Sequence, residues 1–416
     1  MSDRTIVVGA GIVGLACAVE LQRRGRQVTV IDRDGPSQGC SAGNAGMIAT
    51  SENLPLVSPA HLRALPEMLL SAQGPAVIRL RSLPRLVPWL ARAAATLTVE
   101  RQAAISEALR VINGAALSAW RDLLDYVDAR DLLVERGMIE IGASGSGTAL
   151  EKRRASLHTL GVSTSLLGAD DVRALEPEID GAAAGGLLHP NVAHVRDPEL
   201  VSQALLAAFI ARGGRLARAS VTAVEREDGF LLVRAQSGFF QAANVVVAAG
   251  LHAPKLLRPF GVVAPIQAER GYHLMLATDG RSLSRPLTFL RESFVATPMS
   301  GGLRLAGTVE FAAPEDAPDW RRADLLARHA DRYFSRPLDR SGAQRWIGSR
   351  PSLPDSLPAI GRLSHEPRIF YAFGHQHLGL TQAAITASWL ANLVYGSSWS
   401  SDLRPFDIAR FGRHRT

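Results

Sequence analysis

Apolar residues recur along the chain with the two spacings that distinguish strands from helices. Short apolar or alternating runs predict strands at residues 5–8, 27–31, 220–226, 230–235 and 244–248. Helical spacing predicts helices at residues 12–24, 198–211 and 380–395, and a glycine follows each of them closely. The order strand, helix, strand at the start of the chain is typical of a parallel sheet covered by helices.

Two longer segments separate these elements and differ from them in pattern. Residues 54–132 are rich in Leu, Arg, Ala and Pro, which predicts several helices. Residues 261–309 alternate, with Tyr272, Leu274 and Leu276 on one side of an expected strand, which predicts an antiparallel sheet. The α/β elements therefore lie at the start, middle and end of the chain, and a second domain is expected between them.

Length and composition support two globular domains. The chain has 416 residues, of which 47% are hydrophobic and 20% charged. No apolar run reaches the roughly 18 residues of a membrane helix, and we expect no leader peptide before the first strand. Two cysteines form no disulfide framework, so we expect a soluble cytoplasmic protein.

The net charge of +7 comes from arginine, since Lys152 and Lys255 are the only lysines. The arginines are spread along the chain without interleaved aromatic residues, which disfavours a nucleic-acid partner. A basic solvated surface explains them, and contact with an anionic membrane stays open as an alternative.

A glycine-rich turn between the first strand and helix carries the strongest chemical signal. The residues are Gly9, Ala10, Gly11, Ile12, Val13 and Gly14, and Asp32 ends the next strand. The glycines permit a tight turn, close approach of a pyrophosphate, and close helix packing. The amino end of the helix attracts phosphates, and Asp32 can accept hydrogen bonds from a ribose. This unit predicts a dinucleotide site.

Three further segments rich in small residues are expected to surround the rest of that dinucleotide. One is the loop at 40–47, another is the strand end at 245–250, and the last is the turn at 373–381 before the final helix. A bare loop can lie against a flat ring and offer it backbone N–H groups. The expected cofactor contacts outside the fingerprint are Arg33, Ser41, Asn44, Ala45, Gly46, Met47, Val221, Ala249, Gly250, Gly374, His377, Leu378, Gly379, Leu380 and Thr381.

With these motifs the chain resembles the D-amino-acid oxidase superfamily of FAD enzymes, and within it the bacterial D-amino-acid dehydrogenases. The resemblance covers nearly the whole chain and includes the 348–351 segment with Asp355, Pro358 and Gly361. It implies an α/β fold, α+β overall, in which a Rossmann-like FAD-binding domain holds an inserted substrate domain with an antiparallel sheet. We expect residues 1–58, 150–180, 194–260 and 345–416 in the FAD-binding domain. Residues 59–149, 181–193 and 261–344 are expected in the substrate domain.

The resemblance also implies how the site works. Hydride passes from the substrate Cα to flavin N5, and an arginine fork neutralises the buried substrate carboxylate. By resemblance that arginine is Arg350, and Tyr272 is a lid or a second carboxylate ligand, with Arg270 on the same strand face. A plain surface arginine and a plain strand tyrosine are the alternatives.

The two histidines of the 373–381 turn have open roles. His375 and His377 either pack before the last helix or lie near the flavin, where a protonated His375 would stabilise the reduced ring. No metal is expected, because no Cys, Asp or Glu nearby completes a site. Cys40 lacks a family attachment motif, so the FAD is expected to be non-covalent.

The function expected from the resemblance is FAD-dependent oxidative deamination of a D-amino acid. The form of the 374–381 turn is most similar to the branch acting on D-proline or D-hydroxyproline, and electrons would pass to a quinone-type acceptor. Residues 65–99 could then form an amphipathic surface for peripheral membrane contact. The alternatives are a sarcosine- or glycine-type oxidase that uses oxygen, a flavin-bearing subunit that passes electrons to a partner subunit, and, more distantly, a flavoprotein acting on tRNA.

Overall fold

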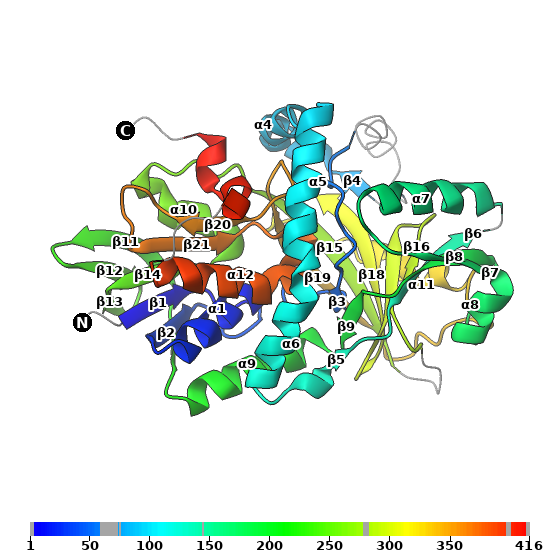
Figure 1. Cartoon of the computed structure of the whole chain (residues 1–416), viewed down its shortest axis with the longest axis horizontal. Helices are drawn as coiled ribbons and strands as arrows, with labels where there is room; N and C mark the ends of the chain where they lie inside the picture. Colours follow the sequence, from blue (N-terminus) through cyan, green and yellow to red (C-terminus); the bar gives the residue numbers. More distant parts are fainter. Residues whose placement is uncertain are drawn as a thin grey trace.

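The computed structural model describes residues 4–58, 74, 76–143, 145–277, 283–396 and 401–412. Two large sheets lie at opposite ends of the molecule, and helices α5 (Val99–Gly114) and α6 (Ala116–Tyr126) stand between them (Figure 1). Within this part of the chain, no helix is long and apolar enough to cross a membrane.

The first sheet has six strands in the order β10-β2-β1-β14-β21-β20. All neighbours pair in parallel except the edge strand β20, which is antiparallel to β21. The strands are β1 (Arg4–Val8), β2 (Gln27–Asp32), β10 (Arg215–Arg218), β14 (Asn244–Val247), β20 (Ala359–Arg362) and β21 (Ile369–Phe373). The strands β1, β2 and β14 are those that the apolar runs predict, to within one residue at each end.

Both faces of this sheet are covered, which explains its continuous apolar strands. Successive residues of β1 belong to different cores: Val7 packs with helices α1 (Ile12–Arg23), α5, α6, α9 (Pro198–Ala211) and α12 (Gly379–Val394). Ile6 and Val8 pack on the other side, against α10 (Ala253–Leu257) and a three-stranded sheet. That sheet is formed by β11 (Val221–Glu227), β12 (Phe230–Ala235) and β13 (Gly238–Ala242).

Local capping residues help to place the helices. Asp197 accepts a hydrogen bond from the Glu199 amide at 2.8 Å, and Pro198 is the first residue of α9. Thr98 caps α5 in the same way. Gly11, the cap residue of α1, has no side chain that could accept such a hydrogen bond, and the first turn of α1 contains no acidic residue.

The second sheet has nine strands, eight of them in the order β19-β15-β18-β17-β16-β6-β8-β7, with the ninth, β4, beside β18. It is mostly antiparallel, as the 261–309 pattern predicts, with parallel pairs only at β16–β6 and β18–β4 among the described strands. The strands are β4 (Ala76–Ile78), β6 (Met138–Ala143), β7 (Ser165–Gly168), β8 (Ala183–His189), β15 (Gln267–Leu276), β16 (Leu287–Phe289), β17 (Phe294–Met299), β18 (Gly302–Phe311) and β19 (Gln344–Ser352).

Smaller elements complete the second part. Helices α7 (Gly147–Thr159), α8 (Ala169–Leu175) and α11 (Arg321–Ala330) contribute to cores on this sheet, and α4 (Leu83–Ala94) packs on Phe311. A three-stranded sheet of β3 (Met47–Ile48), β9 (Ala193–Val195) and β5 (Leu133–Val134) lies between the large sheets. Short 3-10 helices occupy Leu80–Ser82, Arg130–Leu132, Gly250–His252, Arg258–Phe260, Gln376–Leu378, Ser401–Phe406 and Ile408–Phe411.

The expected division of the chain into domains differs from the structure in three places. Within 150–180, β7 pairs with β8 in the nine-stranded sheet, so this segment does not join the six-stranded sheet. Residues 345–352 belong to β19, which pairs with β15. Helices α5 and α6, expected in the substrate domain, share a core with α1 and α12. The physical reason is that a short strand or an amphipathic helix does not encode which sheet it will pack against.

Candidate active site

A cavity of about 1130 Å³ follows the carboxyl ends of the parallel strands and reaches the second sheet. Its walls come from the β1–α1 turn, the end of β2, the residues after β14 and β21, and parts of β15 and β19. Ligand pockets of about 300–1,000 Å³ hold drug-sized molecules, so this volume suits a dinucleotide with a small substrate. Open α/β sheets bind ligands at this edge.

The glycine-rich turn requires glycine for steric reasons. Gly9 has φ 112°, and a Cβ added there would lie 2.4 Å from the Ala248 carbonyl oxygen. A Cβ on Gly14 would lie 2.0 Å from the Gly9 carbonyl oxygen. The turn therefore packs against the end of β14 and against its own helix, and Gly9 and Gly14 have no room for a side chain. At Gly9 and Gly11 the backbone itself lines the cavity.

Ser41 and Asp32 organise the backbone around this turn. The Ile12 amide donates a hydrogen bond to Ser41 Oγ at 3.1 Å, so the 40–47 loop closes over the amino end of α1. Asp32 accepts from the Ala10 amide at 2.7 Å and from the Asp34 and Gly35 amides at 2.9 Å each. A carboxylate offers about four lone-pair positions, which leaves Asp32 one more for a ligand hydroxyl.

The 40–47 loop and the 373–381 turn lie against each other although 333 residues separate Asn44 from His377. Asn44 Nδ2 donates to the His377 carbonyl oxygen at 3.4 Å, and Asn44 Oδ1 accepts from the Gly46 amide at 2.8 Å. Thr381 Oγ1 accepts from the Ala49 amide at 3.0 Å and donates to the Met47 carbonyl oxygen at 3.2 Å. These bonds bring together two of the segments that the sequence assigns to one site.

The expected cofactor residues divide into cavity walls and supports. Those lining the cavity are Gly9, Gly11, Ile12, Val13, Asp32, Arg33, Ser41, Val221, Ala249, Gly250, Gly374 and Gly379, together with His375. The others are not part of this lining: Ala10, Gly14, Asn44, Ala45, Gly46, Met47, His377, Leu378, Leu380 and Thr381. Among this second group, Asn44 and Thr381 make hydrogen bonds within the protein that join the 40–47 loop to the 373–381 turn and to Ala49.

Arg350 lies in β19 beside a buried carboxylate. Its Nη1 is 3.1 Å from Oε1 of Glu269, which is 1% exposed and also accepts a hydrogen bond from Ser352 Oγ at 2.8 Å. A Cβ on the neighbouring Gly271 would lie 2.2 Å from Arg350 Nη2, so this glycine makes room for the guanidinium. Burial lowers the pKa of His377, and the carboxylates of Glu269 and Glu52 oppose that shift.

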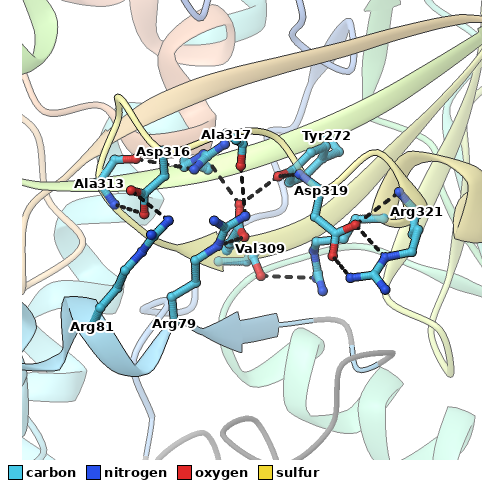
Figure 2. A network of polar contacts seen from close by, with 12 residues as sticks. Arg79, Arg81, Tyr272, Val309, Ala313, Asp316, Ala317, Asp319 and Arg321 are labelled. Atoms are coloured by element: carbon cyan, nitrogen blue, oxygen red, sulfur yellow. Dashed lines mark hydrogen bonds and ion pairs between the residues drawn. The ribbon is translucent and has the colours of Figure 1, made fainter.

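Tyr272 does not occupy the position expected of a lid or carboxylate ligand. It is 1% exposed, its hydroxyl donates to Glu310 Oε2 at 2.6 Å, and the Asp319 amide donates to the same hydroxyl at 3.0 Å (Figure 2). Arg270 shares this face, as expected, with its Nε 3.4 Å from Glu310 Oε2. Neighbouring residues of a strand face opposite sides of the sheet, but this alternation does not determine which side holds the site.

The next residue, His273, faces the cofactor-side loop instead. Its Nδ1 lies 3.2 Å from the Gly43 carbonyl oxygen, and its ring stacks on Trp346 with centroids 5.0 Å apart. A Cβ on Gly43 would lie 2.1 Å from the Trp346 indole, so the loop needs glycine there. Burial lowers the pKa of His273 to about 4, which keeps the ring neutral.

His375 combines the two roles left open for it, since it packs on the last helix and also lines the cavity. It is 4% exposed, its Nε2 lies 3.1 Å from Thr386 Oγ1 of α12, and burial lowers its pKa to about 3. An imidazole in this environment is neutral near pH 7. It lines the cavity as a neutral ring and therefore supplies no positive charge there.

Sequence reasoning missed the side chains that join the two halves of the site. Arg304 in β18 is 5% exposed, and its Nη1 donates to the carbonyl oxygens of Ala42 at 3.1 Å and Asn44 at 2.6 Å. It thereby fastens the 40–47 loop to the second sheet. The only sequence signal was a charged residue between Leu303 and Leu305 in an alternating run, which equally describes a solvent-facing position.

Comparisons with known proteins agree with this arrangement. The DAO family model, described as FAD dependent oxidoreductase, matches residues 4–393. A D-amino-acid oxidase of Bradyrhizobium diazoefficiens is 32% identical over 412 residues, covering 97% of this chain and 98% of its own. A D-amino acid dehydrogenase of Methylobacterium nodulans is 32% identical, covering 94% and 95%.

Solved structures agree on the fold. The crystal structure of glycine oxidase from Geobacillus kaustophilus superposes with a TM-score of 0.73 at 21% identity, covering 98% of this chain and 99% of that one. This likeness confirms the expected Rossmann-like domain with an antiparallel substrate-domain sheet. Together with the match over residues 4–393, it places the chain in the DAO family of FAD-dependent oxidoreductases.

Proposed function

We propose that this FAD-dependent oxidoreductase oxidises the Cα–N bond of a D-amino acid. Two relatives named for D-amino acids, each 32% identical over nearly their whole length, support this substrate class. The observation that carries the proposal is the Arg350 guanidinium, held by Glu269 on the strand pair β15–β19, in which His273 contacts the 40–47 loop. A guanidinium fork is the group best suited to a substrate carboxylate.

The cavity residues fit an FAD. The β1–α1 turn and the amino end of α1 would hold the pyrophosphate, and Asp32 would accept from the ribose. The bound FAD supplies the oxidising ring that takes up two electrons and a proton as hydride. The chain's own contribution is to position that ring, through the 40–47 loop and the 373–381 turn, and to orient the substrate.

Arg350 would orient the substrate by pairing with its carboxylate. Glu269 fixes the guanidinium through Nη1 and leaves its other N–H groups for the ligand. Burying a carboxylate without a partner costs several kcal/mol of free energy. Pairing with Arg350 would remove that cost and so favour binding of the zwitterionic amino acid.

Within D-amino acids we propose D-proline or D-hydroxyproline, on the form of the 374–381 turn. Anaerobic titration of the yellow holoenzyme with D- and L-amino acids, including both epimers of proline, tests this directly. We expect D-proline to bleach the flavin absorbance at lower concentration than acyclic D-amino acids. Bleaching by L-amino acids alone would refute the D assignment, and bleaching by glycine or sarcosine alone would favour the amine-oxidase alternative.

For the electron acceptor we propose a membrane quinone, reached through α4 and the preceding 3-10 turn. Their outer face exposes Leu80 (69%) and Val87 (55%) beside Arg81, Arg85 and Arg92. Arg81 and Arg85 pair with Asp316 and Glu315, whereas residues 79–99 themselves contain no acid. Trp89, which lies within residues 65–99, is 5% exposed and donates to the Ser352 carbonyl oxygen at 3.1 Å, so it is not part of this outer face. Residues 65–73 and 75 of the expected surface lie outside the described residues.

Vesicle binding and product analysis test the acceptor. Salt-sensitive binding to anionic vesicles that weakens in Val87→Asp is the expected result. Steady peroxide formation without vesicle binding would favour oxygen as the acceptor. Flavin reduction without turnover on a soluble artificial acceptor would favour a partner subunit.

A further inference from the structure

Three consecutive carbonyl oxygens, those of residues 42–44, are held by side chains of the nine-stranded sheet. Arg304 Nη1 donates to the first and the third, on Ala42 and Asn44, at 3.1 and 2.6 Å. His273 Nδ1 lies 3.2 Å from the middle one, and because a carbonyl oxygen can only accept, Nδ1 carries the ring proton. Arg304 and His273 are called the loop clamp below.

Both side chains of the loop clamp are buried. Arg304 is 5% exposed, and its ion pair with Asp197 is long, with Nη2 3.9 Å from Oδ2. His273 is 6% exposed and stacks on Trp346, whose indole lies against Gly43. Burying a guanidinium without hydrogen bonds is costly, so the two bonds from Arg304 stabilise one position of the loop against the sheet.

The loop clamp also determines where two backbone amides of the loop point. In a trans peptide the N–H group points opposite to the C=O group of the same unit, so the amides of Gly43 and Ala45 point away from Arg304. Neither amide has a hydrogen-bond acceptor within the described part of the chain, whereas those of Asn44 and Gly46 donate within the loop. Two donors are thus turned away from the sheet and left for a ligand.

The loop clamp shares one face of the nine-stranded sheet with Arg350. Glu269, His273 and Met275 are alternate residues of β15 and therefore lie on the same face. Arg350 of β19 pairs with Glu269, and Arg304 of β18 pairs with Met275. The register of these three strands therefore sets the position of the loop relative to the Arg350 guanidinium.

We propose that Arg304 and His273 are positioning residues that hold the amides of Gly43 and Ala45 against the flavin ring and so fix the ring relative to the substrate. This inference rests on the proposed function, which puts the ring against the loop and the substrate carboxylate on Arg350. Reacting atoms must lie about 3–3.5 Å apart, and a misplacement of about 1 Å can slow a reaction about a hundredfold. Amides aimed at the ring also stabilise its electron-rich reduced form, which raises its reduction potential.

Variants of the loop clamp test the proposal in the holoenzyme. His273→Phe keeps a ring on Trp346 and loses the N–H donor without a change of charge, because burial lowers the pKa of His273 to about 4. We expect the limiting rate of anaerobic flavin reduction by D-proline to fall about tenfold or more, with an unchanged dissociation constant for D-proline. The potential, measured against a reference dye, should fall by about 30 mV, a tenfold change in the two-electron equilibrium constant.

Arg304→Gln removes the other two bonds and should show the same pattern, and His273→Phe decides alone if the Arg304 variant does not fold. Arg285→Gln is the matched control, because Arg285 has a side chain that is 14% exposed and donates to Glu176 and to the Arg136 carbonyl oxygen, outside the cofactor cavity. It should lower the midpoint of thermal unfolding and leave the rate of reduction and the potential unchanged.

Three results would overturn the proposal. One is an unchanged rate and potential in the clamp variants, and another is an equal change of both in Arg285→Gln. The third is a raised dissociation constant for D-proline with an unchanged potential, which would assign the clamp to substrate binding. If D-proline does not reduce the wild-type flavin, the proposed substrate is wrong, while the potentials of the variants still decide whether the clamp positions the ring.

Discussion

Replacing Arg350 tests the centre of the proposed site. The guanidinium touches Glu269 at 3.1 Å and has further N–H groups that the proposal assigns to the substrate carboxylate. Arg350→Lys keeps the positive charge but loses the planar fork, whereas Arg350→Met loses both. The Michaelis constant for the amino acid should therefore rise in both variants, and further in the methionine variant.

The size of the effect follows from the environment. Removing one partner of a desolvated, hydrogen-bonded charge pair costs about 2–5 kcal/mol. At about 1.4 kcal/mol per factor of ten, this corresponds to a rise in KM of about 30-fold to 4,000-fold. Arg350 is 23% exposed in its side chain, so Arg350→Lys should fall near the lower end.

Arg350→Met also leaves the 1% exposed Glu269 carboxylate without its charged partner, which by itself destabilises the fold. The double variant Arg350→Met, Glu269→Gln removes that buried charge and is the matched control. Steady-state rates with an artificial acceptor and thermal unfolding of each holoenzyme separate the two effects. We expect the double variant to regain stability without regaining KM. An unchanged KM in Arg350→Lys would refute the assignment of Arg350 to the substrate.

Three other predictions concern the cofactor cavity and the buried polar groups. Gly14→Ala should yield protein without bound FAD, because the new Cβ would lie 2.0 Å from the Gly9 carbonyl oxygen. The control Gly147→Ala, whose Cβ would have no atom within 4 Å, should keep its FAD. The flavin absorbance of each purified variant measures the bound FAD. Tyr272→Phe removes the hydroxyl that bonds Glu310 and the Asp319 amide, and it should lower the free energy of unfolding by about 1–3 kcal/mol. A lower midpoint of thermal unfolding is the expected result, and an unchanged midpoint would contradict this hydrogen-bond network. Since burial lowers the pKa of His375 from 6.5 to about 3, the unfolded chain binds the extra proton first, and stability should fall as the pH drops below 6.5. Denaturant midpoints measured between pH 7 and pH 4 should show this fall, and a smaller one in His375→Gln.

Local signals predicted the elements that hold the cofactor. The strands on either side of the β1–α1 turn and the final helix begin and end within about one residue of the expected positions, and Asp32 ends β2 as expected. Glycine geometry and hydrophobic period are local signals, because they depend on a few neighbouring residues. Assigning segments to sheets was less successful: β7 and β19 joined the nine-stranded sheet, and α5 and α6 joined the core of the other. The residues of a short strand do not determine which other strand it pairs with.

The sequence by itself determined that glycine-rich segments would form a dinucleotide site, because the steric requirements of a tight turn are met by the residues of the turn itself. Only the tertiary structure decided which side chains face that site. Tyr272 and His273 are neighbours on one strand, yet pairing with β18 and β19 turns the tyrosine to Glu310 and the histidine to the 40–47 loop. Arg304 and Glu269 acquired their roles in the same way, because contacts across a sheet depend on register and packing between residues far apart in the chain.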